Sequence, residues 1–376
     1  MLQNPFVYGR PVIGDKFWGR TEQVKMLRGL IMSHQNTVLV GERRVGKTSL
    51  VMNTAQILKG FSVVKTHFQG VKSVDAACKR LISGIAAMEK EDSKMRKIMQ
   101  MLSRFRVAIA LERYTLDPIL KFDIAHAFQP EDLEEVFRLL KQIGTERKGK
   151  FVVALDEFQD LLRVPDANEL MAMMRGYIQF QTDVTYLYIG SIRHEMVDIF
   201  TKNDSPFLKS ATIVEVGPLE EREFIQSIVT QFKKGGLQVS KPLISEIIEI
   251  TRGNPGDTQQ LCHSLFNVSS PGKAIGEEKL SDALQEIYSC EGKLYEEYIK
   301  HLTEVQIRML LSIAQLGGKG VYSKAFMSSA RVTNSAVIKH TVARLLDREL
   351  IFLDSQKEYR FVNPFFRKWL MIQGIA

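Results

Sequence analysis

The sequence of 376 residues contains little cysteine and no long apolar run. Cys78, Cys262 and Cys290 are odd in number and widely spaced, which excludes a disulfide framework and a CxxC metal site and indicates a reducing cytoplasm. No apolar stretch approaches the roughly 18 residues that cross a bilayer, and the first residues lack the apolar core of a signal peptide. We therefore expect a cytoplasmic protein with no membrane partner.

Charge is unevenly distributed along the chain. The net charge is +8, and the length favours two or three domains. From residue 300 onward there are twelve Lys and Arg against five Asp and Glu, so nearly the whole positive excess lies in the last fifth of the sequence. This asymmetry predicts a polyanionic partner for the C-terminal part, with nucleic acid as the first candidate.

The most specific pattern is a phosphate-binding loop. Residues 41–48 read GERRVGKT and match G-x-x-x-x-G-K-[ST], between an apolar β-branched run and a helix-competent stretch. A loop in that context directs backbone amides and a helix dipole at phosphates. Lys47 would reach the β- and γ-phosphates, and the Thr48 hydroxyl would ligate Mg²⁺. A chance match in a surface turn is the alternative. The nucleotide-binding residues expected from the loop are Gly41, Arg43, Arg44, Val45, Gly46, Lys47, Thr48 and Ser49.

A second apolar run ends in two acids. Residues 150–155 read KFVVAL, and Asp156 and Glu157 follow directly. At the carboxyl end of a buried strand, Asp156 would lie beside the phosphates as a partner of Mg²⁺. Glu157 would be the catalytic base that orients and deprotonates water. A helix start capped by Asp156 is the alternative, but the preceding phosphate loop favours hydrolysis.

A third apolar run, at residues 184–190, suits a central parallel strand. Polar residues just beyond it would face the terminal phosphate, because ligands bind at the carboxyl edge of such sheets. Ser191 could hold the attacking water and Arg193 could sense the γ-phosphate. Arg193 could instead be a surface residue that pairs with Glu195 or Asp198.

The remaining pattern divides the chain. Before the apolar run that ends at Asp156, we expect a strand at residues 61–68 and helices at 73–88, 94–111 and 130–143. We expect a last strand at residues 211–216. A Gly-Pro break follows. Helices are then expected at residues 220–233, 241–251, 257–266 and 277–299.

The last block predicts a winged helix, because three helices at residues 303–315, 323–330 and 333–348 precede a short hairpin pattern. Its third helix places Lys339, His340 and Arg344 on the exposed side, from which they could contact duplex DNA. Arg344 could equally pair with a nearby acid.

Together these pieces resemble the archaeal-type group of AAA+ and STAND P-loop ATPases. The motifs that carry the resemblance are FWGR at 17–20, GERRVGKTSL at 41–50, LDEFQ at 155–159, IGSIRHEM at 189–196, RGNP at 252–255 and VNPFFRKWL at 362–370. The resemblance implies an α/β P-loop NTPase domain with a parallel sheet and a helical insertion, then an all-α lid and a C-terminal winged helix. The expected boundaries are 1–216, 217–299 and 300–376.

The resemblance also implies further binding residues. Phe17, Gly19 and Arg20 would contact the adenine and ribose, and Pro255 would pack near the base from the lid. Read without the family, Pro255 is a proline that starts a helix. Arg43 and Arg44 look like the paired arginines of this group; otherwise they belong to a solvated face.

The sequence therefore predicts a protein that binds ATP or ADP with Mg²⁺ and hydrolyses ATP. Two function classes stay open: a DNA-associated ATPase, and a slowly hydrolysing signalling switch whose winged helix binds a protein partner. Residues 257–260, DTQQ, lack the lid arginine of many AAA+ motors, which favours a switch over a hexameric motor. A small-molecule kinase would have no obvious use for the long insertion or the winged helix.

Overall fold

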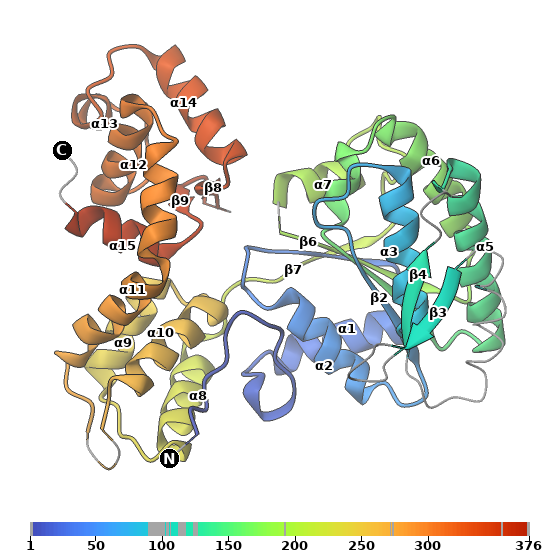
Figure 1. The fold of residues 1–376 in the computed structure, drawn as a ribbon, viewed down its shortest axis with the longest axis horizontal. Helices are drawn as coiled ribbons and strands as arrows, with labels where there is room; N and C mark the ends of the chain where they lie inside the picture. The colour runs from blue at the N-terminus through green and yellow to red at the C-terminus, as the bar shows by residue number, and fades with distance from the viewer. Residues whose placement is uncertain are drawn as a thin grey trace. The chain divides into compact units, whose positions relative to one another are not determined.

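The chain divides into two compact units (Figure 1). One is Arg20–Gly217, and the other combines Met1–Gly19 with Pro218–Ala376. The segment Met1–Gly19, which we expected in the first domain, thus belongs to the same compact unit as Pro218–Ala376. The expected domain boundaries stay predictions. The computed structural model describes residues 3–88, 102, 105, 107–111, 118–122, 127–191, 193–270, 272, 274–354 and 356–373, with the backbone alone at 107–111, 118–122 and 193.

The first unit is built on a five-stranded parallel sheet of order β2-β5-β6-β1-β7. The apolar runs that the sequence marks out form its buried centre, since every residue of β1 and β6 is buried. Because the strands are parallel, the carboxyl ends of β1, β5 and β6 meet at one edge of the sheet. The strands are β1 (Thr37–Val40), β2 (Ser62–His67), β5 (Phe151–Asp156), β6 (Thr185–Gly190) and β7 (Thr212–Glu215).

Helices cover both faces of this sheet (Figure 1). Alternate strand residues such as Val38, Val153 and Tyr186 join a core with α3, α5, α6 and α7. Helices α1 and α2 pack against each other on the opposite face. The helices of this unit are α1 (Thr21–Met32), α2 (Lys47–Ile57), α3 (Val74–Ala86), α5 (Pro130–Glu146), the 3₁₀ helix η3 (Phe158–Arg163), α6 (Ala167–Ile178) and α7 (Arg193–Thr201).

The insertion between β2 and β5 differs from the expected helical layer. The helix expected at residues 94–111 is wrong at its end, because Val107–Leu111 is strand β3 and pairs antiparallel with β4, Pro118–Phe122. Most of residues 94–106 lies outside the described residues. The helices expected at 73–88 and 130–143 correspond to α3 and α5.

The second unit is mostly helical. Phe6 and Trp18 of the N-terminal segment pack edge to face, with ring centroids 6.0 Å apart, and Trp18 lies 6.1 Å from the Phe224 ring. The amide of Val7 donates to the Gln259 side chain at 3.0 Å, which ties this segment to α10. The helices of this region are α8 (Glu221–Lys234), α9 (Lys241–Thr251), α10 (Pro255–Asn267) and α11 (Lys279–Lys300).

A winged helix completes the second unit. Its hairpin pairs Ile351 with Phe361, and Tyr295 of α11 packs on Phe366 at 5.3 Å between ring centroids. The predicted fold class is therefore confirmed. No helix that the structure describes is long and apolar enough to cross a bilayer. The elements are α12 (Glu304–Leu316), α13 (Lys324–Ser329), α14 (Ser335–Asp347), β8 (Ile351–Leu353), β9 (Tyr359–Phe361) and α15 (Pro364–Ile372).

Candidate functional site

The loop between β1 and α2 depends on two glycines. A Cβ atom on Gly41 would lie 2.2 Å from the backbone oxygen of Val216, so only glycine allows this close approach. Gly46 has φ +95° directly before α2, a conformation that disfavours other residues. The two glycines let the chain turn sharply from a buried strand into a helix whose N-terminus opens at the carboxyl edge of the sheet.

Lys47 is buried within this loop, whereas Arg43 and Arg44 are exposed. Its side chain is buried, and Nζ donates to the backbone oxygens of Gly41 and Glu42, both at 2.9 Å. Burial lowers the pKa of Lys47 to about 8, although the nearby Glu157 and Asp156 carboxylates oppose that shift. The first residues of the loop therefore surround the Lys47 ammonium group and fix its position.

Thr48 and Asp156 meet at the same edge. The Thr48 hydroxyl donates to Asp156 Oδ2 at 2.8 Å. Burial raises the pKa of Asp156, and the hydrogen bond from Thr48 partly offsets the shift. His67 ends β2 in register with Asp156, and its Nδ1 lies 3.7 Å from Asp156 Oδ2. Thr48 and Asp156 thus place two hard oxygen donors together, the ligand type that Mg²⁺ prefers.

Glu157 follows Asp156 in the left-handed conformation, with φ +51°. Its Oε2 accepts hydrogen bonds from the Ser191 hydroxyl at 2.8 Å and from Gln159 Nε2 at 2.6 Å. Burial raises the pKa of Glu157, but these hydrogen bonds and the Lys47 charge outweigh burial, so the net pKa lies below the usual value. The carboxylate is therefore ionised at neutral pH, and the side chains of Ser191 and Gln159 fix its orientation.

Two residues of this site escaped the sequence reasoning. Gln159 is almost fully buried, and a Cβ on Gly190 would lie 2.4 Å from its Oε1. Its position two residues after Glu157 was a possible signal. His67 is the other, and the sequence carried no signal for it, because only the pairing of β2 with β5 brings it next to Asp156.

Arg20 contacts the backbone of the loop between β1 and α2. Its guanidinium is 3% exposed, and Nη2 donates to the backbone oxygens of Val45 at 2.7 Å and Gly217 at 2.8 Å. Burial lowers the pKa of Arg20 to about 10, so it stays charged at neutral pH. Arg20 and Gly217 are the first and last residues of the sheet unit. One side chain therefore joins both ends of this unit to the loop.

The other predicted site residues occupy several environments. Arg43 and Arg44 are exposed and Ser49 is buried in the first turn of α2. Phe17 and Gly19 belong to the other unit, as does Pro255, which is the first residue of α10. Their predicted contacts with the base stay predictions.

The Arg193 side chain lies outside the described residues, although its backbone begins α7. The two acids that the alternative reading assigned to it have other partners. Arg163 makes two contacts of 3.2 Å with the Glu195 carboxylate, and Lys202 bonds Asp198 at 2.8 Å. The role of Arg193 as a phosphate sensor stays a prediction.

A second candidate surface is the third helix of the winged helix. In α14, Ile338, Val342 and Leu345 are buried, whereas Lys339 and Arg344 are exposed. Within the described part of the chain, neither cation makes an ion pair. His340 is also exposed. On the wing, Arg360 contacts Asp354 and Glu358, so its charge is largely neutralised.

Comparisons with known proteins agree with this fold. Residues 293–372 match the family described as a probable winged helix domain. The Walker-type ATPase of Pyrococcus abyssi is similar over 96% of this chain and 99% of its own, with a TM-score of 0.66 and 21% identity. The ORC2 protein of Aeropyrum pernix (96% and 97% covered, TM-score 0.46, 16% identity) is also similar. So is the RuvB branch migration motor of Thermotoga maritima (93% and 94% covered, TM-score 0.45, 15% identity). No curated protein matches.

The resemblance inferred from the sequence motifs is thereby confirmed at the level of the fold. The chain has the fold of a Walker-type ATPase followed by a winged helix.

Proposed function

We propose that the sheet unit binds Mg-ATP and hydrolyses it. The observation that carries this proposal is the arrangement at one edge of the sheet: the Thr48 hydroxyl lies 2.8 Å from the Asp156 carboxylate, and Glu157 next to it is held by Ser191. Lys47 is the first residue of α2, the helix that also carries Thr48. Phosphoryl transfer to water requires a cation near the phosphates, oxygen ligands for a metal ion and an ionised carboxylate.

The residues present fit a magnesium ion. In sites of this kind the ion takes one or two protein oxygens and completes its shell with phosphate oxygens and water, and Thr48 and Asp156 supply two protein oxygens. When bound, Mg²⁺ would neutralise charge on the β- and γ-phosphates. The raised pKa of buried Asp156 would return toward normal beside a cation, which favours binding of the ion.

Lys47 and Arg20 prepare the loop for phosphate. Among the described residues, the Lys47 ammonium donates to two neutral backbone oxygens, so an anionic phosphate is a stronger acceptor for it. Arg20 holds the backbone oxygen of Val45 on the far side of the loop. Because the turn is already formed, less conformational entropy is lost when the nucleotide binds.

Glu157 is the proposed base. Water attacks the γ-phosphorus, its proton passes to the Glu157 carboxylate, and the bond to the β–γ bridging oxygen breaks, so that ADP leaves. A carboxylate with a lowered pKa is a weak base, and its main contribution is to orient the water. The Ser191 hydroxyl, already bonded to Glu157, lies where it can hold the same water.

The experiment that tests this function is a pair of substitutions. Glu157→Gln keeps the shape of the side chain and removes the base, so Mg-ATP binding should persist while single-turnover hydrolysis slows by about 10²-fold or more. Lys47→Ala should abolish nucleotide binding. Unchanged turnover in Glu157→Gln removes this residue from the mechanism, and unchanged ATP affinity in Lys47→Ala removes the loop.

A second candidate function is binding of duplex DNA by the winged helix. It is favoured by the exposure of Lys339, His340 and Arg344 on α14 and by the lack of ion pairs at the two cations within the described residues. Winged helices place their third helix in the major groove, with neighbouring cations on phosphates. The competing possibility is a slowly hydrolysing switch whose winged helix binds a protein partner.

A further inference from the structure

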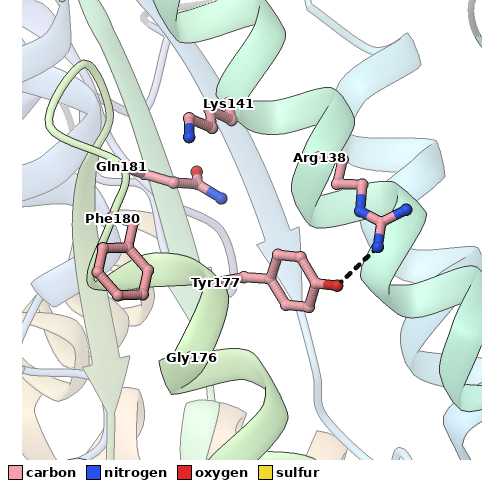
Figure 2. Close-up of a pocket in the computed structure, with 6 residues that line it drawn as sticks. All are labelled: Arg138, Lys141, Gly176, Tyr177, Phe180 and Gln181. Carbon is pink, nitrogen blue, oxygen red and sulfur yellow. Dashed lines mark hydrogen bonds between the residues drawn. The ribbon is translucent and has the colours of Figure 1, made fainter.

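A pocket of about 400 Å³ opens on the outer surface of the sheet unit (Figure 2). It lies between α5 and the end of α6 and is lined by Arg138, Lys141, Gly176, Tyr177, Phe180 and Gln181. This volume falls in the range of ligand sites. None of the six residues takes part in the phosphate site described above, so the pocket requires an explanation of its own.

The polar groups at the base of the pocket are already satisfied. Gln181 donates to the backbone oxygen of Phe137 at 2.9 Å and accepts from the Tyr186 hydroxyl at 2.8 Å. The Tyr177 hydroxyl donates to Glu134 at 2.7 Å and accepts from Arg138 at 3.0 Å, the bond drawn in Figure 2. A ligand would therefore meet aromatic faces here and not a polar network.

Phe180 and Gly176 make room for a ring. The Phe180 side chain is 69% exposed, which is unusual for phenylalanine. A Cβ atom added to Gly176 would find no atom within 4 Å, so the space above this turn of α6 is open. A flat apolar group could lie against Phe180 and Tyr177 there, as aromatic pairs do.

The charges around the pocket select among ligands. Lys141 is exposed and forms no ion pair within the described residues. Arg138, in contrast, pairs with Glu134 and Glu135 and lies over the Tyr177 ring, 5.6 Å from its centroid. The pocket thus offers one free positive charge beside two carboxylates. That balance suits a single anionic group and disfavours a chain of phosphates.

We infer that this pocket binds a peptide segment of a partner protein that carries a large aromatic side chain next to one acidic residue. The ring would occupy the space between Phe180 and Gly176, and the carboxylate would meet Lys141. Such binding would give the protein a docking point separate from the winged helix.

The test uses acetyl-Trp-Glu-amide as the probe, with full-length protein and ligand-observed NMR titration. Two matched probes separate the contributions: acetyl-Trp-Gln-amide lacks the charge and acetyl-Ala-Glu-amide lacks the ring. We expect millimolar binding for the first. Binding of the second should be about threefold to fivefold weaker, which is the scale of one exposed ion pair. The third should show no binding.

Variants locate the binding. Lys141→Gln and Phe180→Ser change exposed side chains and should leave the fold intact. Lys141→Gln should make the affinities for the Trp-Glu and Trp-Gln probes equal. Phe180→Ser should weaken the affinity for each of these probes by about tenfold. Gly176→Leu should block the pocket, while Gly176→Ala is the matched control that keeps it open.

Three outcomes would overturn the inference. In the first, the Trp-Glu probe does not bind at millimolar concentration. In the second, the probe binds but none of the variants changes its affinity. In the third, oligothymidylate displaces the probe, and this displacement depends on Phe180 and Lys141. The last result would assign the pocket to single-stranded nucleic acid.

Discussion

Glu157 and Ser191 are joined by two hydrogen bonds: Glu157 Oε2 accepts from the Ser191 hydroxyl at 2.8 Å and from its backbone amide at 3.3 Å. Glu157 follows β5 and Ser191 follows β6, so these bonds connect the ends of two neighbouring strands. A carboxylate held in this way has a defined orientation, and its pKa depends on its hydrogen-bond donors. Both properties can be measured.

Ser191→Ala should slow single-turnover ATP hydrolysis by about tenfold without changing nucleotide affinity, because the orientation of Glu157 loosens while the phosphate loop is untouched. The hydrogen bonds from Ser191 lower the pKa of Glu157, so loss of the hydroxyl should move the acidic limb of the pH–rate profile to higher pH. Ser191→Thr, which keeps the hydroxyl, should restore both. A rate loss with an unmoved acidic limb would contradict this role.

Arg20→Met should lower the free energy of unfolding by about 1–3 kcal/mol, because one buried and one partly buried carbonyl oxygen lose their charged donor. ADP affinity should also fall, because Val45 is no longer held on the far side of the loop. The matched control is Arg28→Met, which removes an exposed arginine from α1. Urea unfolding and ADP titration measure the two effects. A variant with control-like ADP affinity would limit Arg20 to a structural role.

Much of the sheet could be predicted because its strands are short apolar runs that end in polar residues. The expected strand at 184–190 corresponds to β6, and the helix expected at 241–251 is α9. Residues 107–111, VAIAL, were assigned to a helix, because a short apolar run has no alternation to distinguish strand from helix. This segment is a strand because it pairs with residues 118–122, and no local sequence pattern predicts that pairing.

The candidate site also contains residues that the sequence predicts and residues that it does not. Lys47, Thr48 and the two acids follow from motifs whose spacing is itself the signal. The contact of Arg20 with Val45 could not be predicted, because it joins residues 25 positions apart through a buried side chain. The bond from Gln159 to Glu157 is local in sequence but depends on the left-handed backbone at Glu157. His67 faces Asp156 only because β2 and β5 pair in that register.

Nucleotide affinity should fall as pH rises above about 8, the value to which burial lowers the pKa of Lys47. The ammonium form attracts phosphate, and above this pH the free protein increasingly holds the neutral amine, so binding must take up a proton. Calorimetric titration of ADP in two buffers of different ionisation enthalpy measures this uptake. It should be small at about pH 7.5, where the terminal phosphate of ADP is already ionised, and rise toward one proton per site above the pKa of Lys47. Equal heats in both buffers at high pH would contradict it.

If the winged helix binds duplex DNA, affinity should depend steeply on salt. Each lost phosphate contact should flatten the slope of log K against log salt by about one unit. Lys339→Ala with Arg344→Ala should therefore reduce the slope by about two units. The control removes the same charge from α11, by Lys279→Ala with Lys300→Ala, whose lysines pair with Asp282 and Glu297.

Anisotropy titration of a labelled duplex at two salt concentrations makes this comparison. The α11 control should keep the slope of the unmodified protein, because its lysines already have carboxylate partners and release few counterions from DNA. If both double variants lower the slope equally, the attraction is one of net charge and α14 has no special part in it. If the unmodified protein shows no binding, the exposed cations of α14 serve a protein partner, and the winged helix belongs to a switch.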